Sequence, residues 1–179
     1  MRPDPAKPYY TAYDKRYRSV YAQGVEYWSA HPEELAAVEK DVRHSLKSSG
    51  MLPGARLIEF GCGEGFVGEV LANMGYRYTG IDIAEAAVEK AQRRLAHWGD
   101  RATVIAADLL DLSAIPSAVF DAGLDVSCLH MLVVDADRTL YFHNALRVLK
   151  PGSPMLFCRE AFRRTLLRSP LRVMMNGSE

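Results

Sequence analysis

Carboxylates recur at the ends of short apolar segments: Glu59, Asp82, Asp108, and Asp125, which leads on to His130. A carboxylate can accept hydrogen bonds from both hydroxyls of a ribose or from an amino group of a base. One such residue alone is usually a helix cap or a solvated loop side chain. Three at successive segment ends, beside a glycine-rich turn, instead indicate a ligand site, with Asp82 facing a ribose and Asp108 an adenine amino group.

Glycines occupy every second position after the first carboxylate, in the run Glu59-Phe60-Gly61-Cys62-Gly63-Glu64-Gly65. The apolar residues 57–58 precede this run and an amphipathic segment follows it at residue 66, which predicts a strand, a tight turn and a helix. A turn without side chains lets the backbone approach a ligand closely. The sequence therefore predicts a ligand-binding turn at residues 61–65.

The glycine pattern also fits a second class of cofactor. Gly63 to Gly68 satisfies G-x-G-x-x-G, and Asp82 follows about 20 residues later, as in a dinucleotide site. The earlier start at Gly61, the charge of Glu64 near a pyrophosphate and the third carboxylate Asp108 count against NAD. An NAD-dependent oxidoreductase stays as an alternative at this point.

Alternating strand and helix patterns must position these residues. Strands are expected over 56–60, 78–83, 103–107, 119–126 and 155–158. Helices are expected over 66–74, 85–98 and 137–149, and an earlier one starts within 31–34 and ends at 48–50. The inward face of the last helix is expected to hold Leu140, Ala145, Leu146 and Leu149. This alternation predicts an α/β fold with a doubly wound, mainly parallel sheet, whose ligand site lies at the carboxyl ends of the strands.

The N-terminal part of the chain is rich in aromatic residues. Tyr10, Tyr13, Tyr17 and Tyr21 follow a helical spacing, and Trp28 comes shortly after them. Two interpretations stay open: a helix fixed to the core by aromatic packing, and a lid over a ligand. We expect residues 1–30 to form this aromatic segment and residues 31–179 to form a single cofactor-binding domain.

Composition narrows the class of protein and its partners. The 179 residues contain 22 basic and 22 acidic residues, so no overall positive field attracts nucleic acid or an anionic membrane. Arg164, Arg168 and Arg172 lie four apart and are interpreted as a solvated helix face. Three widely spaced cysteines fit a reducing, cytoplasmic environment, and no spacing typical of a metal site is present. Neither a signal peptide nor a membrane span is expected.

The motifs together resemble those of the class I S-adenosylmethionine-dependent methyltransferases, over about residues 9–160. The run 59–65 is similar to the first motif of that family, 78–83 to the second, 107–109 to the third and 120–121 to the start of the fourth. Residues 146–152 are similar to its L-x-x-L-K-P-G-G motif, with Ser153 in place of the final glycine. The N-terminal residues 13–17 and Trp28 resemble its small-molecule branch, in which an aromatic segment packs over the cofactor.

The resemblance implies a Rossmann-like methyltransferase fold and methyl transfer from S-adenosylmethionine to a small-molecule acceptor, leaving S-adenosylhomocysteine. The implied cofactor contacts are Tyr17, Trp28, Glu59, Gly61, Cys62, Gly63, Gly65, Asp82, Ile83, Asp108, Leu109 and Asp125. His130 and Asp125 are the implied catalytic residues, with His130 either a general base or a packing and capping residue. No metal is implied.

The chain is short after its last predicted strand. The family usually continues there with a helix and an antiparallel hairpin, whereas residues 159–179 are too few for both. We therefore expect the C-terminal strands of the family to be missing, with a homodimer as one way to cover the open sheet edge. A non-catalytic cofactor-binding module is the remaining alternative.

Overall fold

A six-stranded parallel sheet forms the centre of the computed structural model, which describes residues 8–28, 31–159 and 174–175. The strand order is β3-β2-β1-β4-β5-β6, and every pairing between the described strands is parallel. The strands are β1 (Arg56–Phe60), β2 (Arg77–Asp82), β3 (Ala102–Ala106), β4 (Ala122–Val126), β5 (Met155–Cys158) and the two-residue β6 (Met174–Met175). The chain order reverses between β1 and β4, where such sheets bind ligands.

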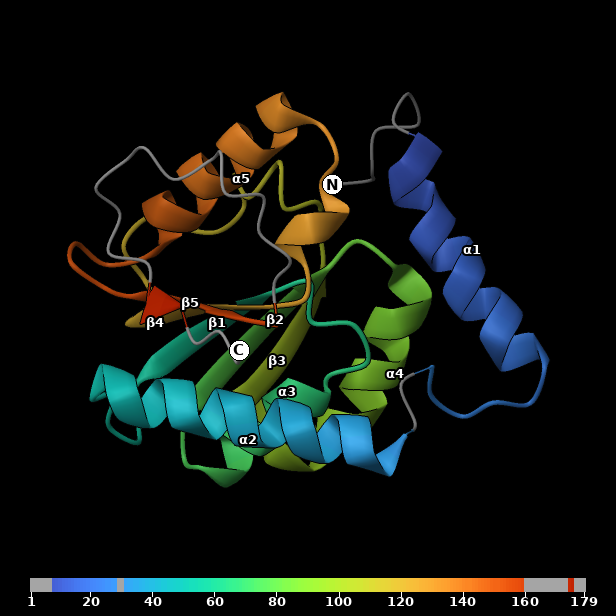
Figure 1. Ribbon diagram of the computed structural model, residues 1–179, viewed down its shortest axis with the longest axis horizontal. Coiled ribbons are helices and arrows are strands. Elements are labelled where there is room, and N and C mark those ends of the chain that lie inside the picture. The colour runs from blue at the N-terminus through green and yellow to red at the C-terminus, as the bar shows by residue number, and fades with distance from the viewer. Residues whose placement is uncertain (1–7, 29–30, 160–173, 176–179) are drawn as a thin grey trace.

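Helices cover both faces of the sheet, as Figure 1 shows. The α-helices are α1 (Pro8–Ala22), α2 (Pro32–Ser49), α3 (Phe66–Asn73), α4 (Glu85–Leu95) and α5 (Asp135–Val148). Two short 3₁₀ helices are η1 (Ala96–Arg101) and η2 (Leu129–Met131). Helices α2, α3 and α4 lie on one face and α5 on the other, while α1 stands beside α4 (Figure 1). This arrangement confirms the doubly wound fold.

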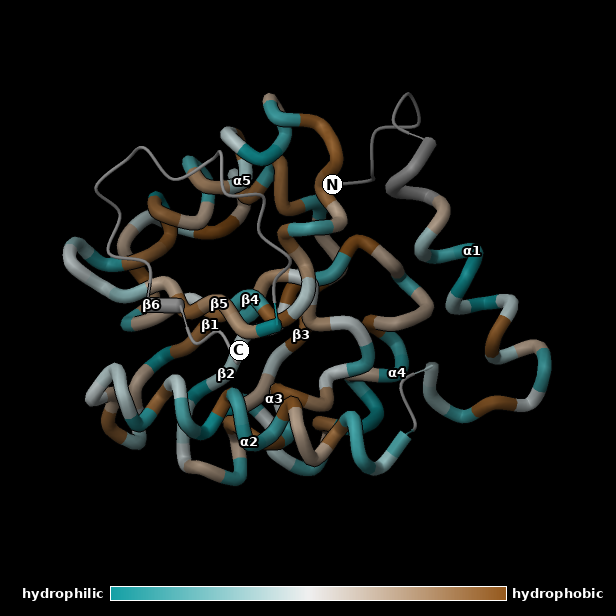
Figure 2. Tube along the Cα trace, viewed as in Figure 1, coloured by the Kyte–Doolittle hydropathy of each residue, from teal (hydrophilic) through white to brown (hydrophobic). Residues whose placement is uncertain are grey.

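Two hydrophobic cores result, one on each face of the sheet. Side chains alternate along β1, so that Leu57 joins the core under α2, α3 and α4, whereas Ile58 and Phe60 join the core under α5. Helix α3 is hydrophobic over most of its length (Figure 2) because α2 and α4 pack against it as well as the sheet. The two cores fix the strands so that their carboxyl ends lie side by side, where the predicted ligand site lies.

Most predicted elements are observed with small shifts, and three features differ. Strand β4 begins at Ala122 rather than at 119, since Val119 and Phe120 pair instead with the chain at 148–149. Helix α4 ends at Leu95 and continues as η1, which Gly99 interrupts with non-helical angles. The sequence did not predict β6.

The prediction for the inward face of α5 was right for Ala145 and Leu149, which are buried, and wrong for Leu140 and Leu146. Leu140 and Leu146 are 41% and 47% exposed, while α5 instead buries Asp137, Tyr141 and Asn144, together with Ala145 and Val148. The buried polar residues have partners inside the fold, and Asn144, for example, donates to the carbonyl oxygen of Leu109. An apolar stripe alone could not identify this face, because part of it is polar.

Some predictions fall outside the described residues. The arginine pattern at 164, 168 and 172 is one of them. Within the part of the chain that the structure describes, no helix combines the length and the apolar content that a bilayer span requires.

Candidate functional site

A pocket opens at the carboxyl ends of the central strands. It is lined by Tyr13, Tyr17, Gly61, Asp82, Ile83, Asp108, Leu109, Ser127, Cys128, Met131 and Leu132. Six of these were predicted as cofactor contacts: Tyr17, Gly61, Asp82, Ile83, Asp108 and Leu109. The ends of β1, β2, β3 and β4 thus meet at one site, as the doubly wound topology requires.

The glycine turn lies directly against β2 and β4. The amides of Gly61 and Cys62 donate to the carbonyl oxygen of Ile81, at 2.8 and 2.9 Å, and so fix the turn to β2. Gly61 has a φ of +74°, and a Cβ there would lie 2.3 Å from Sγ of Cys128. Only glycine combines this backbone angle with so close an approach.

Asp82 is fixed in the pocket by two backbone amides. One carboxylate oxygen accepts from Gly63 N and the other from Ala84 N, each at 2.8 Å. Burial raises the pKa of Asp82 above its ordinary value, and the backbone hydrogen bonds oppose that shift. A carboxylate oxygen has a second lone pair, so each can still accept a hydroxyl donor from a ligand.

Asp108, which follows β3, also lines this half of the pocket. One of its carboxylate oxygens accepts from Leu110 N at 2.8 Å, which fixes the turn that follows. Ile83 and Leu109 also line this half, so two apolar side chains lie near two carboxylates. Such a combination suits a flat heterocycle attached to a sugar.

The segment after β4 forms the other half of the pocket. Ser127, Cys128, Met131 and Leu132 line it, and Ser127 has a φ of +61°. This left-handed angle is rare for residues other than glycine and turns the chain sharply out of β4. Sequence reasoning missed these four residues because no motif marks them.

The two predicted catalytic residues are not among those lining the pocket. Asp125 is fully buried and accepts from the amides of Cys128 and Leu129 and from the hydroxyl of Tyr141. Through the two amide hydrogen bonds, the buried Asp125 fixes the backbone of the segment after β4. His130 lies in η2 and is partly buried. Their catalytic roles stay predictions.

Glu59 of β1 and Cys62 of the glycine turn are buried and do not line the pocket. Glu59 is 2% exposed, and its carboxyl accepts from the hydroxyl of Tyr78 at 2.6 Å. Burial raises the pKa of Glu59 to about 8, against the effect of that hydrogen bond. Gly63 and Gly65 shape the turn rather than line the pocket: a Cβ on Gly65 would lie 2.9 Å from Cβ of Ala91. These residues therefore hold the glycine turn in place without lining the pocket.

The aromatic segment supplies one wall of the pocket. Tyr13 and Tyr17 of α1 line it, and the hydroxyl of Tyr17 lies 3.0 Å from where a Cβ on Gly63 would be. Burial raises the pKa of Tyr17 well above its usual range, so its hydroxyl stays protonated. Trp28 packs edge-on against Tyr17 at 4.9 Å and is 39% exposed, outside the pocket lining. The helical spacing of the tyrosines was the signal that could have added Tyr13.

Comparisons with known proteins agree with this geometry. A family model described as a methyltransferase domain matches residues 57–152. A ubiquinone biosynthesis O-methyltransferase of Xanthomonas axonopodis pv. citri is 31% identical over 146 residues, which make up 80% of this chain and 57% of that protein. The chain thus spans little more than half of the length of that curated relative.

Solved structures show the same fold. The N-methyltransferase NodS from Bradyrhizobium japonicum, in complex with S-adenosylhomocysteine, matches with a TM-score of 0.61 and 26% identity, over 72% of this chain and 63% of that one. The [4+2]-cyclase SpnF matches with a TM-score of 0.59 and 23% identity, over 71% of this chain and 47% of that one. The latter likeness concerns the fold alone.

Proposed function

The chain belongs to the methyltransferase domain family, and we propose that it binds S-adenosylmethionine and transfers the methyl group to a small-molecule acceptor. The observation that carries this proposal is Asp82, whose carboxylate two backbone amides fix in the pocket at the end of β2. A carboxylate so oriented suits the two hydroxyls of a ribose.

The residues of the pocket fit the rest of the cofactor. Asp108 can accept from an adenine amino group while Ile83 and Leu109 contact the ring. Gly61 leaves room for close approach of the ligand at the glycine turn. The aromatic face of Tyr17 favours a cationic sulfonium in the same pocket.

When bound, the cofactor supplies an activated methyl group on a sulfonium. The chain's own part is to align an acceptor with the carbon–sulfur bond and to exclude water. Ser127, Cys128, Met131 and Leu132 bound the half of the pocket left for the acceptor. His130 is the candidate base for acceptors that must lose a proton.

The proposal extends to the kind of acceptor, the oligomeric state and the location of the protein. The curated relative is named for O-methylation in ubiquinone biosynthesis, so oxygen acceptors come first in an acceptor panel, followed by amines because NodS is named an N-methyltransferase. A homodimer across the sheet edge and a cytoplasmic location complete the proposal.

Calorimetric titration with S-adenosylhomocysteine, and separately with NADH, tests the cofactor. We expect the wild type to bind S-adenosylhomocysteine in the micromolar range and Asp82→Ala to bind at least about tenfold more weakly. Asp111→Ala is the matched control: it removes a partly exposed carboxylate from the loop after β3, outside the pocket lining, and its affinity should equal that of the wild type. Binding of NADH in place of S-adenosylhomocysteine would favour the oxidoreductase instead.

A further inference from the structure

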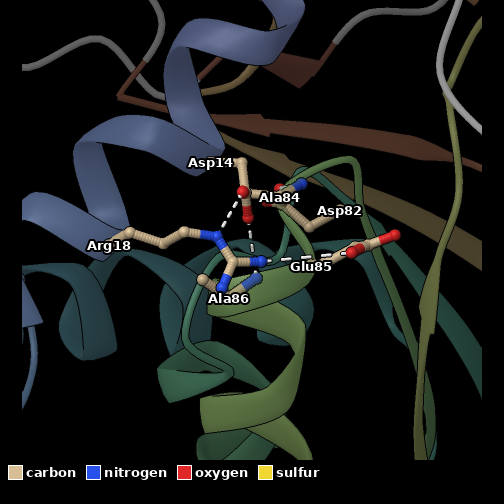
Figure 3. A network of polar contacts seen from close by, with 6 residues as sticks. All are labelled: Asp14, Arg18, Asp82, Ala84, Glu85 and Ala86. Atoms are coloured by element: carbon tan, nitrogen blue, oxygen red, sulfur yellow. Dashed lines mark hydrogen bonds and ion pairs between the residues drawn. The ribbon is translucent and has the colours of Figure 1, made fainter.

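Residues 8–28, called the N-terminal segment from here on, have two carboxylate contacts beside the site, in addition to the stacking of Lys90 and Arg94 of α4 on Tyr21 and Tyr27. The first is Asp14 on α1. One of its oxygens accepts from the amide of Ala86 at 2.9 Å, and the other accepts from Nε of Arg18 at 2.6 Å. Figure 3 shows Asp14 directed at the first turn of α4, with Arg18 reaching toward Glu85.

This contact caps α4 from a distant part of the chain. The N-cap residue Ala84 offers no side chain to the first amides of the helix, so Asp14 provides the acceptor from 72 positions away. The amide of Ala84 binds Asp82 in the same turn (Figure 3). One turn of backbone is therefore held by a pocket carboxylate and by a carboxylate of the N-terminal segment.

The second carboxylate is Glu64, in the middle of the glycine turn. One oxygen of its buried carboxylate accepts from the hydroxyl of Tyr21 at 2.9 Å and from the amide of Trp28 at 2.6 Å. Glu64 itself is not among the residues that line the pocket. In the sequence analysis, its charge counted against a pyrophosphate at this turn. In the structure, that charge binds the end of the N-terminal segment.

The wall tyrosines are on the same helix as Asp14 and Tyr21. Tyr13 and Tyr17 precede Tyr21 on α1, flank Asp14, and line the pocket. Tyr17 also packs against Trp28, whose amide Glu64 holds. The position of the wall thus depends on both carboxylates, although neither belongs to it.

We propose that Asp14 and Glu64 are positioning residues that clamp the N-terminal segment over the bound cofactor and so control how tightly the cofactor is held. The inference rests on the proposed function, since the clamped wall belongs to the cofactor pocket. If only a fraction of the molecules has the segment docked, the apparent affinity falls by that fraction.

Hydrogen exchange and calorimetry on the full chain test the clamp together. Asp14→Ala and Glu64→Ala should speed amide exchange in residues 8–28 without ligand, leave exchange in β1 and β4 unchanged, and weaken S-adenosylhomocysteine binding by about tenfold, mainly through faster dissociation. Glu64→Gln should restore near-wild-type values, because one amide oxygen can accept both hydrogen bonds. Glu39→Ala is the control, since it removes only a solvent-facing partner of Arg43 on α2.

The outcomes separate the clamp from the proposed function. Wild-type binding with unchanged affinity in both alanine variants would overturn the clamp and leave the methyltransferase proposal standing. Slow exchange in residues 8–28 of both variants would also overturn it, because the carboxylates would then not hold the segment. Failure of the wild type to bind S-adenosylhomocysteine would overturn the proposed function and with it the role of the clamp.

Discussion

Two buried carboxyl groups lie under the two halves of the pocket, on opposite faces of the sheet, and each has a tyrosine partner. Glu59 of β1 accepts from Tyr78 beneath the glycine turn. Asp125 of β4 accepts from Tyr141 of α5, and in addition from the amides of Cys128 and Leu129. Only Asp125 therefore holds backbone that itself forms part of the pocket.

The difference shows how the two halves are built. In the half formed by β1, β2 and β3, backbone amides hold the ligand-facing Asp82, and glycines allow the close approach of the turn. In the half after β4, Ser127, Cys128, Met131 and Leu132 line the pocket, and Asp125 accepts a hydrogen bond from the amide of Cys128. Under the proposed function, the first half suits the cofactor, which is the same in every reaction. The side chains of the second half can differ with the acceptor.

Gly61→Ala should have the largest effect, because Gly61 is where the two halves touch. Its new Cβ would meet Sγ of Cys128 at 2.3 Å at a φ of +74°, so we expect a loss of about 3 kcal/mol in unfolding free energy from strain and overpacking. Gly50→Ala is the control: φ is +70° with nothing within 4 Å, and strain alone costs about 1 kcal/mol. Urea denaturation measures both. Equal losses would show that the two halves do not press on each other.

Asp125→Ala should have the next largest effect, and on stability rather than on cofactor contacts. It leaves the hydroxyl of Tyr141 and two backbone amides without their acceptor, a loss of about 2 kcal/mol in unfolding free energy. Tyr141→Phe removes a single hydrogen bond and should cost about 1 kcal/mol. Urea denaturation and S-adenosylhomocysteine titration measure both variants. Unchanged stability of Asp125→Ala would show that these hydrogen bonds do not stabilise the segment after β4.

The first half of the pocket was largely predictable from the sequence. A backbone with a positive φ favours glycine, and a polar ligand contact at a strand end favours a carboxylate. The roles of Gly61, Asp82 and Asp108 can therefore be predicted from their residue types. The wall after β4 has no such requirement. Met131 and Leu132 are ordinary apolar residues, and only the fold shows that they line a pocket.

Polar contacts between residues far apart in the chain could not be predicted from the sequence either. Asp14 gave no sign that it caps a helix 72 residues later, and Glu64 looked like a charge near a ligand. The inward face of α5 was only partly predicted for the same reason, because Asp137 and Asn144 are buried with partners that periodicity does not reveal. Patterns of residue type predict local structure, whereas polar pairing depends on the tertiary fold.

The last prediction is a dependence on pH, in contrast to the losses above, and concerns Glu59, the carboxyl without backbone donors in the contacts described above. Burial raises its pKa from 4.5 to about 8 in the folded protein. Between these values the folded protein keeps the proton and the unfolded chain has released it. The unfolded state then binds fewer protons, so stability falls as pH rises, by at most about 1.4 kcal/mol per pH unit, and levels off above pH 8.

Glu59→Gln should remove this dependence, since the amide copies the neutral acid and does not titrate. Unfolding free energies of the wild type and the variant at pH 5.5, 6.5 and 7.5 (roughly the span that linkage predicts) should give a difference that grows in favour of the variant as pH rises. Glu39→Gln, at an exposed position, should give a flat difference. If the Glu59→Gln difference is flat as well, or grows in favour of the wild type, Glu59 is ionised in the fold. The contrast between the two buried carboxyls would then rest on the backbone bonds of Asp125 alone.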